Sequence, residues 1–276
     1  MDKKIFRVKG TFVNGQWFNS KKRYDVFNPS NGEKLADVPI SDIKELELAV
    51  ASAKKAQLSW SKISLINRAN ALEKLSKKIL EKEEEFALID SYDSGNALTG
   101  MRKDVKETVN NIRYFCGLVR EVKGETFSME QNHLNFTRYQ PYGVVLKINP
   151  FNHPFRFCVE KIAAPLLMGN SLIIKNSEQA PISSLRFCEL LGDIFPKGLI
   201  NVVTGGPDNG KFLVEHPDIK RIAVIGSVNT GIAIAKSAAP LLKNVSLELG
   251  GKNPIIVFDD ADPDFAASLA IKGMNL

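Results

Sequence analysis

Cysteine and histidine are scarce in this 276-residue sequence, with three of each, and they form no recognisable cluster. None of the cysteines, Cys116, Cys158 and Cys188, belongs to a Cys-x-x-Cys pair. Structural zinc sites and disulfide frameworks draw on closely spaced residues of these types. We therefore expect neither a metal site nor a disulfide.

Long apolar runs are also missing. The first ten residues mix charged and apolar side chains, unlike the apolar stretch of a secretory leader. No run approaches the roughly 20 apolar residues that a membrane-spanning helix needs. We expect a cytoplasmic protein without a membrane partner.

Positive charge is only slightly in excess, with 37 Lys and Arg against 31 Asp and Glu. The two signs are mixed along the chain, as where Lys77 and Lys78 precede Glu81 and Glu83. Nucleic-acid-binding proteins usually concentrate positive charge on one patch, so we expect no nucleic-acid partner.

The N-terminal part is predicted to begin with a β-hairpin and to continue as helices. Asn14 and Gly15 separate two short apolar runs, which is a strong hairpin signal. Asp42, three residues before Glu45, predicts a helix N-cap, and four helical segments extend to about Lys123. Residues 124–141 are polar with weak alternation and predict an exposed hairpin, which needs a partner elsewhere.

Short aliphatic runs dominate the remainder, and a helical pattern follows each of the first four. Strands are predicted at Gly143–Ile148, Ser171–Lys175, Leu199–Val203, Arg221–Ile225, Val245–Leu249 and Pro254–Phe258. Such alternation predicts a doubly wound α/β fold, with a parallel sheet covered on both faces. Asp262 and Pro263 predict the start of a last helix.

Ligands of doubly wound sheets bind at the carboxyl ends of the strands, so the residues there are candidates. Asn152 follows the first of these strands between Pro150 and Pro154. A rigidly held amide can stabilise a developing oxyanion, although an asparagine here can equally cap the next helix. Lys175 and Glu178 can hold ribose hydroxyls, or they can form an ordinary surface ion pair.

Two glycine turns follow the next two strands. One contains Gly206, Pro207 and Gly210, and the other begins with Gly226 and Ser227. Glycines allow a phosphate or a ring to approach the backbone, but neither turn is the G-x-G-x-x-G fingerprint. Taken alone, each stretch is more often a simple turn than a phosphate-binding loop.

Glu248 lies at the end of the predicted strand Val245–Leu249, just before Gly250 and Gly251. A glutamate in a partly apolar cleft can act as a general base. The alternative is an ion pair with Lys252.

Taken together, these motifs resemble the aldehyde dehydrogenase superfamily. Leu247–Pro254 matches the family's glutamate active-site pattern at every position. Residues 150–154 resemble its P-W-N-F-P loop, with Phe151 and His153 as departures. Residues 175–178 resemble K-P-S-E, and residues 226–231 resemble G-S-x-x-x-G.

The resemblance implies an oxidoreductase that converts an aldehyde to a carboxylic acid with NAD, or alternatively NADP, through a cysteine thiohemiacetal and thioester. Asn152 would donate to the oxyanion and Glu248 would activate water. The cofactor-binding residues would be Pro150, Phe151, Lys175, Glu178, Gly206, Pro207, Gly210, Gly226, Ser227, Leu249 and Gly250. The hairpin would join subunits of a full-length homo-oligomer.

The resemblance also divides the chain. Residues 1–123 and 142–250 would form a Rossmann-like NAD(P)-binding domain, 124–141 the bridging hairpin, and 251–276 the start of a truncated catalytic domain. The family nucleophile lies in a G-Q-x-C stretch beyond the glutamate, and no cysteine follows Glu248 here. We expect the nucleophile beyond the C-terminus and the chain alone to be inactive. The alternative is a catalytically silent dinucleotide-binding or interaction protein made as a short chain.

Overall fold

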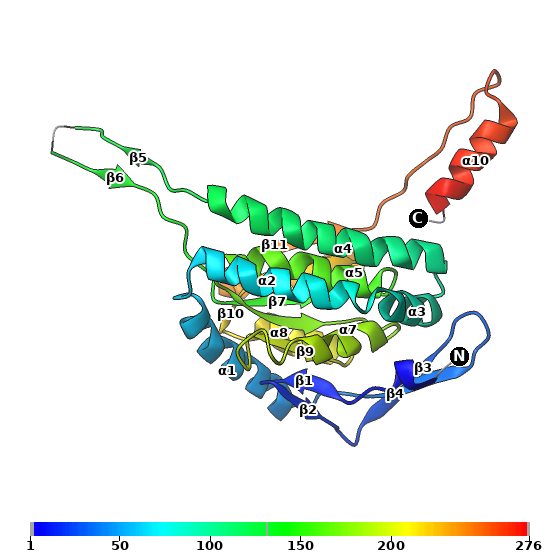
Figure 1. Cartoon of the computed structure of the whole chain (residues 1–276), viewed down its shortest axis with the longest axis horizontal. Helices are drawn as coiled ribbons and strands as arrows, with labels where there is room; N and C mark the ends of the chain where they lie inside the picture. The colour runs from blue at the N-terminus through cyan, green and yellow to red at the C-terminus, as the bar shows by residue number, and fades with distance from the viewer. Residues whose placement is uncertain (1–2, 131, 275–276) are drawn as a thin grey trace.

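A seven-stranded sheet forms the centre of the structure, a computed structural model that describes residues 3–130 and 132–274 (Figure 1). Its strand order is β11-β10-β7-β8-β9-β1-β2, and the first four neighbouring pairs are parallel. The strands are β1 (Thr11–Val13), β2 (Gln16–Phe18), β7 (Val144–Ile148), β8 (Ser171–Lys175), β9 (Ile200–Val203), β10 (Ile219–Gly226) and β11 (Asn244–Leu249).

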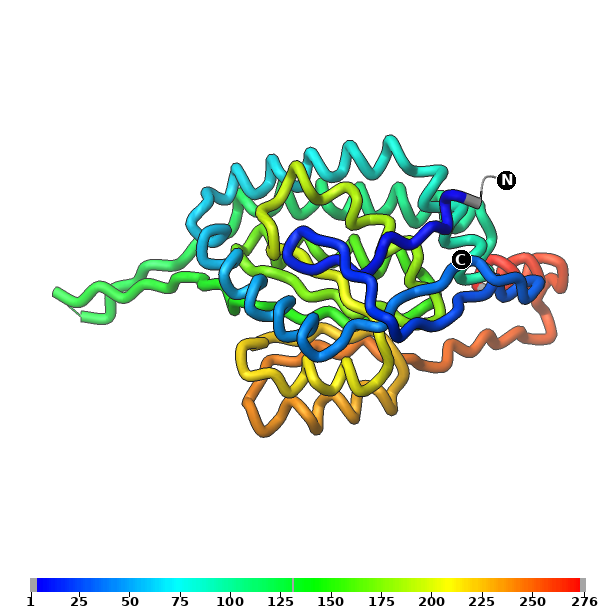
Figure 2. The backbone as a smooth tube through the Cα atoms, turned by 90° about the horizontal axis from the view of Figure 1, so that it is seen from below, coloured from blue at the N-terminus to red at the C-terminus, as the bar shows by residue number. Residues whose placement is uncertain are grey.

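Helices cover both faces of this sheet (Figure 2). The longer ones are α1 (Ile43–Trp60), α2 (Leu65–Leu80), α3 (Glu83–Ser94), α4 (Leu98–Leu118), α8 (Pro207–Glu215), α9 (Val228–Ala238) and α10 (Pro263–Met274). Short helices are α5 (Pro154–Val159), α6 (Ala163–Leu167) and α7 (Ile182–Phe187). No helix in the described ranges is long and apolar enough to cross a membrane.

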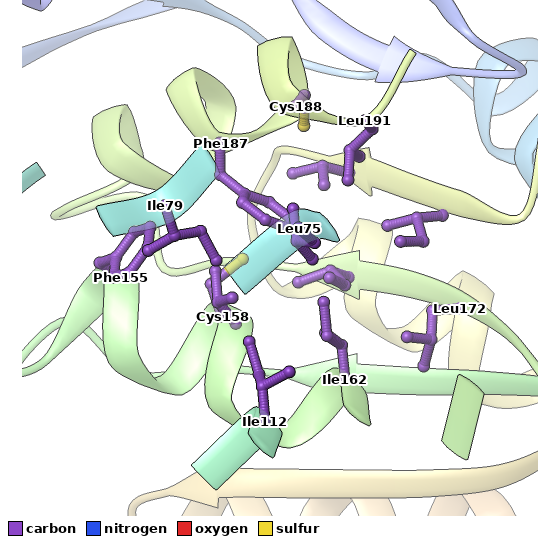
Figure 3. Packing of buried hydrophobic residues seen from close by; sticks show 14 of the residues in the cluster. Leu75, Ile79, Ile112, Phe155, Cys158, Ile162, Leu172, Phe187, Cys188 and Leu191 are labelled. Carbon is purple, nitrogen blue, oxygen red and sulfur yellow. The ribbon is translucent and has the colours of Figure 1, made fainter. Parts of the chain in front are cut away.

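The two faces have separate cores because successive strand residues point to opposite sides. Leu172 and Ile174 of β8 pack with α2 and α4 to α7, as Figure 3 shows in part, whereas Ile173 packs with α1, α8 and α9. The predicted doubly wound α/β class is therefore confirmed.

Local signals at the N-terminus are confirmed in detail. Asn14 and Gly15 connect β1 to β2 with φ values of 52° and 72°, the left-handed conformation that this tight turn requires. Asp42 caps α1, since its carboxylate accepts a hydrogen bond from the Glu45 amide at 2.9 Å. A further hairpin joins β3 (Arg23–Phe27) to β4 (Lys34–Pro39).

The predicted exposed hairpin is present as β5 (Thr126–Phe127) and β6 (Asn135–Phe136) and projects from the body (Figure 1). Its apolar side chains face solvent, with Phe136 66% and Met129 77% exposed.

One predicted strand is wrong. Pro254–Phe258 is exposed and forms no strand in the described part of the chain, and it leads away from the body to α10 (Figure 1). An aliphatic run favours a strand, but a strand forms only where a neighbouring edge accepts its backbone hydrogen bonds. No described strand pairs with residues 254–258. The last helix begins at Pro263, as predicted.

Candidate active site

The loops that carry the predicted site residues leave the sheet at one edge. Ile148 pairs with Lys175, Lys175 pairs with Val203, and Gly226 pairs with Leu249. The carboxyl ends of five parallel strands are therefore neighbours, which is where doubly wound sheets bind ligands.

Lys175, Glu178, Gly206 and Gly210 lie together at this edge. A Cβ atom on Gly206 would lie 3.3 Å from Glu178 Oε2, and one on Gly210 would lie 3.6 Å from Lys175 Cδ. Lys175 is buried, and its Nζ donates to the Asn176 carbonyl at 3.4 Å. Burial lowers the pKa of Lys175, and the Glu178 carboxylate opposes that shift. The two glycines leave space beside an acidic and a basic group.

Two helix N-termini lie at the same edge. Gly206 precedes Pro207, the first residue of α8, and Ser227 caps α9 by accepting a hydrogen bond from the Thr230 amide at 3.2 Å. The positive end of a helix dipole favours an anion at such positions. The carboxyl edge of the sheet therefore combines two helix N-termini, which attract an anion, with the Lys175 and Glu178 side chains, which can hydrogen-bond to hydroxyl groups.

Gly231 allows α9 to pack closely against the Leu249 side chain at the end of β11. A Cβ atom there would lie 2.7 Å from the Leu249 side chain. The glycine lets the end of β11 approach α9, which fixes the point where Leu249 and Gly250 leave the sheet.

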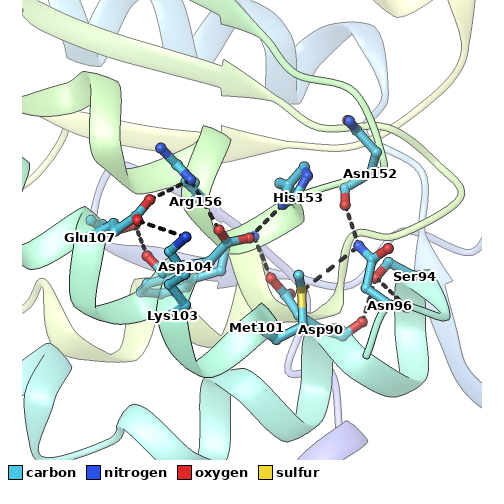
Figure 4. Close-up of polar contacts among 12 residues, drawn as sticks. Asp90, Ser94, Asn96, Met101, Lys103, Asp104, Glu107, Asn152, His153 and Arg156 are labelled. Atoms are coloured by element: carbon cyan, nitrogen blue, oxygen red, sulfur yellow. Dashed lines mark hydrogen bonds and ion pairs between the residues drawn. The ribbon is translucent and has the colours of Figure 1, made fainter. Parts of the chain in front are cut away.

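The loop that contains Asn152 contacts residues of α3, of α4 and of the turn between these two helices (Figure 4). Asn96 Nδ2 donates to the Asn152 carbonyl, and His153 Nδ1 lies 2.5 Å from Asp104 Oδ2. Arg156 also contacts Asp104, with Nη1 at 3.1 Å from Oδ1. The backbone carbonyl of Asn152 and the side chain of the next residue, His153, are therefore both fixed by polar contacts.

The helix-capping alternative for Asn152 is not what the structure shows. His153 occupies the N-cap of α5 and makes no side-chain cap, while Asp90 Oδ2 accepts the Phe155 amide at 2.9 Å. The Asn152 side chain is exposed and makes no hydrogen bond within the ranges described. Its amide is available for a ligand. Phe151 beside it is 48% exposed and Pro150 is half-buried.

Glu248 forms an ion pair, but with Lys161 rather than with Lys252. Lys161 follows α5, 87 residues earlier in the chain. The Glu248 side chain is 59% exposed. A surface pair of this kind contributes only about 0–1 kcal/mol, so the carboxylate can leave it.

Sequence reasoning missed Lys161, Asp104, Asn96 and Lys147. Lys147 is buried in β7, where its Nζ donates to the carbonyls of Phe157 at 2.7 Å and Cys158 at 3.2 Å. Burial lowers the pKa of Lys147 to about 8. Of these four residues, only Lys147 could have been noticed in the sequence, because it is a lysine within an otherwise aliphatic predicted strand.

All three cysteines are free and buried. Burial raises the pKa of Cys116 and of Cys158 to about 11, and it raises the pKa of Cys188 well above its usual value. Thiols of this kind are almost entirely protonated at neutral pH and are poor nucleophiles. The described residues contain no group of three or more His, Cys, Asp or Glu placed to hold a metal ion.

A doubly wound sheet with glycine turns and helix N-termini at its carboxyl edge defines a dinucleotide-binding α/β protein of the Rossmann-like class. The chain belongs to the aldehyde dehydrogenase family, whose sequence model matches residues 17–276.

Individual relatives support this assignment. The chain is 36% identical over 269 residues to aldehyde dehydrogenase tropH of Talaromyces stipitatus, covering 96% of this chain and 52% of that protein. It is 35% identical over 266 residues to hydroxyisobutyraldehyde dehydrogenase of Mycolicibacterium austroafricanum, covering 95% and 53%. The crystal structure of betaine aldehyde dehydrogenase from Staphylococcus aureus in complex with NAD+ superimposes with a TM-score of 0.93 at 33% identity, covering 98% and 56%. The chain thus spans about half the length of these relatives.

Proposed function

We propose that the protein carrying this chain oxidises an aldehyde to a carboxylic acid with NAD+, with NADP+ as the alternative cofactor. The observation that carries the proposal is that the Lys175–Glu178 cradle, Asn152 and Glu248 lie at or just beyond the carboxyl ends of β8, β7 and β11, which all belong to one edge of the sheet. The Staphylococcus aureus relative crystallised with NAD+ supports the choice of cofactor.

The residues at this edge fit a dinucleotide, because Gly206 and Gly210 leave open the space that a side chain would fill beside Glu178 and Lys175. Lys175 and Glu178 would bind the adenosine ribose, and Ser227 the pyrophosphate. The bound cofactor supplies the hydride acceptor. The other residues assigned to cofactor binding are Pro150, Phe151, Gly206, Pro207, Gly210, Gly226, Leu249 and Gly250.

Asn152 would act in the addition of the thiolate to the aldehyde, and Glu248 would act in the hydrolysis of the thioester. When a cysteine thiolate adds to the aldehyde carbonyl, the exposed Asn152 amide donates a hydrogen bond to the oxygen that becomes negative. After oxidation to the thioester, Glu248 accepts a proton from water as the water attacks the acyl carbon. The C–S bond then breaks, releasing the acid and the thiolate.

We propose that the nucleophile lies beyond Leu276, and that the chain alone is inactive. The support is that Cys116, Cys158 and Cys188 are all buried with raised pKa values. In this proposal residues 1–123 and 142–250 bind the cofactor and 251–276 begin the catalytic domain. The exposed hairpin at 124–141 joins subunits of a homo-oligomer, and the protein acts in the cytoplasm.

The test separates cofactor binding from turnover. Isothermal titration of the chain with NAD+ is expected to show saturable binding, and addition of an aldehyde is expected to yield no NADH. The complete protein from its natural source, identified by intact mass, is expected to form NADH.

NADH formation by the chain itself would overturn the position of the nucleophile. If the natural subunit has the mass of the chain and binds NAD+ without turnover, the silent dinucleotide-binding alternative holds instead. Absence of NAD+ binding would remove the proposal altogether.

A further inference from the structure

A cavity of about 270 Å³ lies at the base of the β5–β6 hairpin. Pro141 and Met168, which line it, come shortly before β7 and β8 begin. The cavity is therefore at the amino edge of the sheet, opposite the loops assigned to the cofactor. Its volume is near the lower end of that of small-molecule pockets, so it would hold a small ligand or the end of a chain.

Arg68 of α2 contributes a buried cation to this cavity, being only 7% exposed. Its Nη1 donates to the carbonyls of Trp60 at 3.3 Å and Ser61 at 3.1 Å. Its Nε is buried without a hydrogen-bond partner in the described part of the chain. The guanidinium is thus held in place with part of its donor capacity unused.

No carboxylate balances the charge of Arg68 within residues 3–130 and 132–274. Burial lowers the pKa of Arg68, and no acidic side chain opposes that shift. A buried charge without a counter-ion is costly, because its lost hydration is not replaced. An anion bound in the cavity would offset that cost.

Arg138, at the base of the hairpin, is a second arginine that lines the same cavity. It is exposed, and none of the ion pairs in the described ranges includes it. The cavity also has an apolar wall that includes Leu65, Val122 and Met168. Two planar cations beside an apolar wall suit a carboxylate attached to an apolar group, since a guanidinium can bind both oxygens of a carboxylate.

We propose that this cavity is a binding site for a carboxylate, with the charged group between Arg68 and Arg138 and the apolar group against Leu65 and Met168. Two sources share this chemistry. One is a free organic acid, and the other is the α-carboxylate that ends a polypeptide. The proposal does not depend on the assigned cofactor site, because it uses none of the residues at the carboxyl edge. It does share Arg138 with the hairpin that the proposed function assigns to joining subunits.

Isothermal titration of the folded chain distinguishes the two sources. Benzoate represents a free acid, and benzamide is its neutral control of nearly the same shape. Acetyl-Phe-Leu with a free carboxylate represents a chain end, and its C-terminal amide is the matching control. Each acid is expected to bind at least about tenfold more tightly than its neutral partner if it occupies the site, since charge-assisted hydrogen bonds are about twice as strong as neutral ones.

Variants place the binding in this cavity. Arg138→Met removes a cation at an exposed position and is expected to weaken binding of the preferred acid about tenfold. Arg113→Met removes another exposed arginine, in α4, that does not line the cavity, and it should leave binding unchanged. Arg68→Lys keeps the charge but removes the planar fork, so it should also weaken binding, with circular dichroism confirming the fold.

Tighter binding of benzoate identifies a free acid as the ligand, and tighter binding of the peptide acid identifies a chain end. The site would be refuted if neither acid bound, if the neutral partners bound equally well, or if Arg113→Met and Arg138→Met had the same effect. NAD+ titration of the same variants should give the unaltered affinity.

Discussion

Asp90 of α3 accepts a hydrogen bond from the Phe155 amide at 2.9 Å and thereby caps α5, 65 residues further along the chain. Asp93, one turn later on α3, does the same for α7 through the Ile182 amide at 2.9 Å. Two buried carboxylates on one helix therefore begin the helices that follow β7 and β8. The orientation of the loops at the carboxyl edge depends on α3.

The burial of Asp90 predicts a pH dependence of stability. Burial raises the pKa of Asp90 to about 7, from about 4 in an unfolded chain. Between those values the folded state retains a proton that the unfolded state has lost, so the free energy of unfolding falls as pH rises through this window. Asp90→Asn should reduce this slope, measured by urea unfolding at pH 5, 6, 7 and 8.

Asp193→Asn is the control for this series, because the Asp193 side chain is 93% exposed. It should leave the slope unchanged. An Asp90→Asn variant that keeps the full slope would show that another group carries the titration.

Gly198 precedes β9 and is the site of a second stability prediction. Its φ of +82° is left-handed, and a Cβ atom there would lie 2.8 Å from the Ser52 carbonyl oxygen of α1. Gly198→Ala therefore combines backbone strain with a clash against backbone and should lower the free energy of unfolding by about 2–4 kcal/mol.

Gly32→Ala separates the two effects of that substitution. Gly32 has a φ of +72° but no atom within 4 Å of its Cβ position. This variant should cost only the backbone strain, about 1–2 kcal/mol. Equal losses from the two alanine variants in urea melts would contradict the predicted clash.

The burial of the three cysteines predicts their reactivity. Cys116, Cys158 and Cys188 should all resist a thiol reagent such as Ellman's reagent in the folded chain, and all should react in concentrated urea. Rapid reaction of one thiol under native conditions would contradict the structure at that position. It would also reopen the question of a nucleophile within the chain.

The sheet and the first hairpin were predictable because their signals are local. The strand runs that end at Ile148 and Lys175, and the Asn14–Gly15 turn, each occupy a few consecutive residues. The failed strand at 254–258 has the same local signal but pairs with no described strand, and the sequence of one segment does not reveal whether it has a partner.

The contacts that hold the candidate site were not predictable in this way. Lys161 and Glu248 are 87 residues apart, and Asp104 and His153 are 49 apart. Neither pair has a periodic pattern or a fixed spacing. The sequence therefore predicted the edge that carries the site but not the side chains that support it.

Asn152 and Glu248 should have different kinetic defects in the complete protein. Glu248→Gln should form about one equivalent of NADH per subunit and then stop, because the acyl-enzyme is not hydrolysed. Asn152→Ala should lose the initial NADH burst, since the oxyanion forms before oxidation, with a loss of about 10²–10³ in rate. Rapid-quench measurement of NADH and acid separates the two steps.

Lys252 and Lys161 provide the control for the Glu248 assignment. Lys252→Met should behave as the unmodified protein, because Lys252 is not the partner of Glu248. Lys161→Met, which removes the observed partner, should alter the rate of acid release but not the burst. The reverse result would favour the Lys252 pairing and contradict the structure.

Glu178 should determine the choice between NAD+ and NADP+. Its carboxylate lies next to Gly206, where the adenosine ribose is proposed to bind, and would repel a 2′-phosphate through like charge. Lys175 beside it is the opposing influence, because its cation would attract the same phosphate. Glu178→Gln removes the repulsion and leaves the attraction, so the ratio of the dissociation constants for NADP+ and NAD+ should fall about tenfold, or by about 1.4 kcal/mol. Glu215→Gln, at the far end of α8, removes the same charge without touching the cradle and should leave the ratio unchanged when both cofactors are titrated calorimetrically. An unaltered ratio in Glu178→Gln would place the ribose elsewhere along the edge.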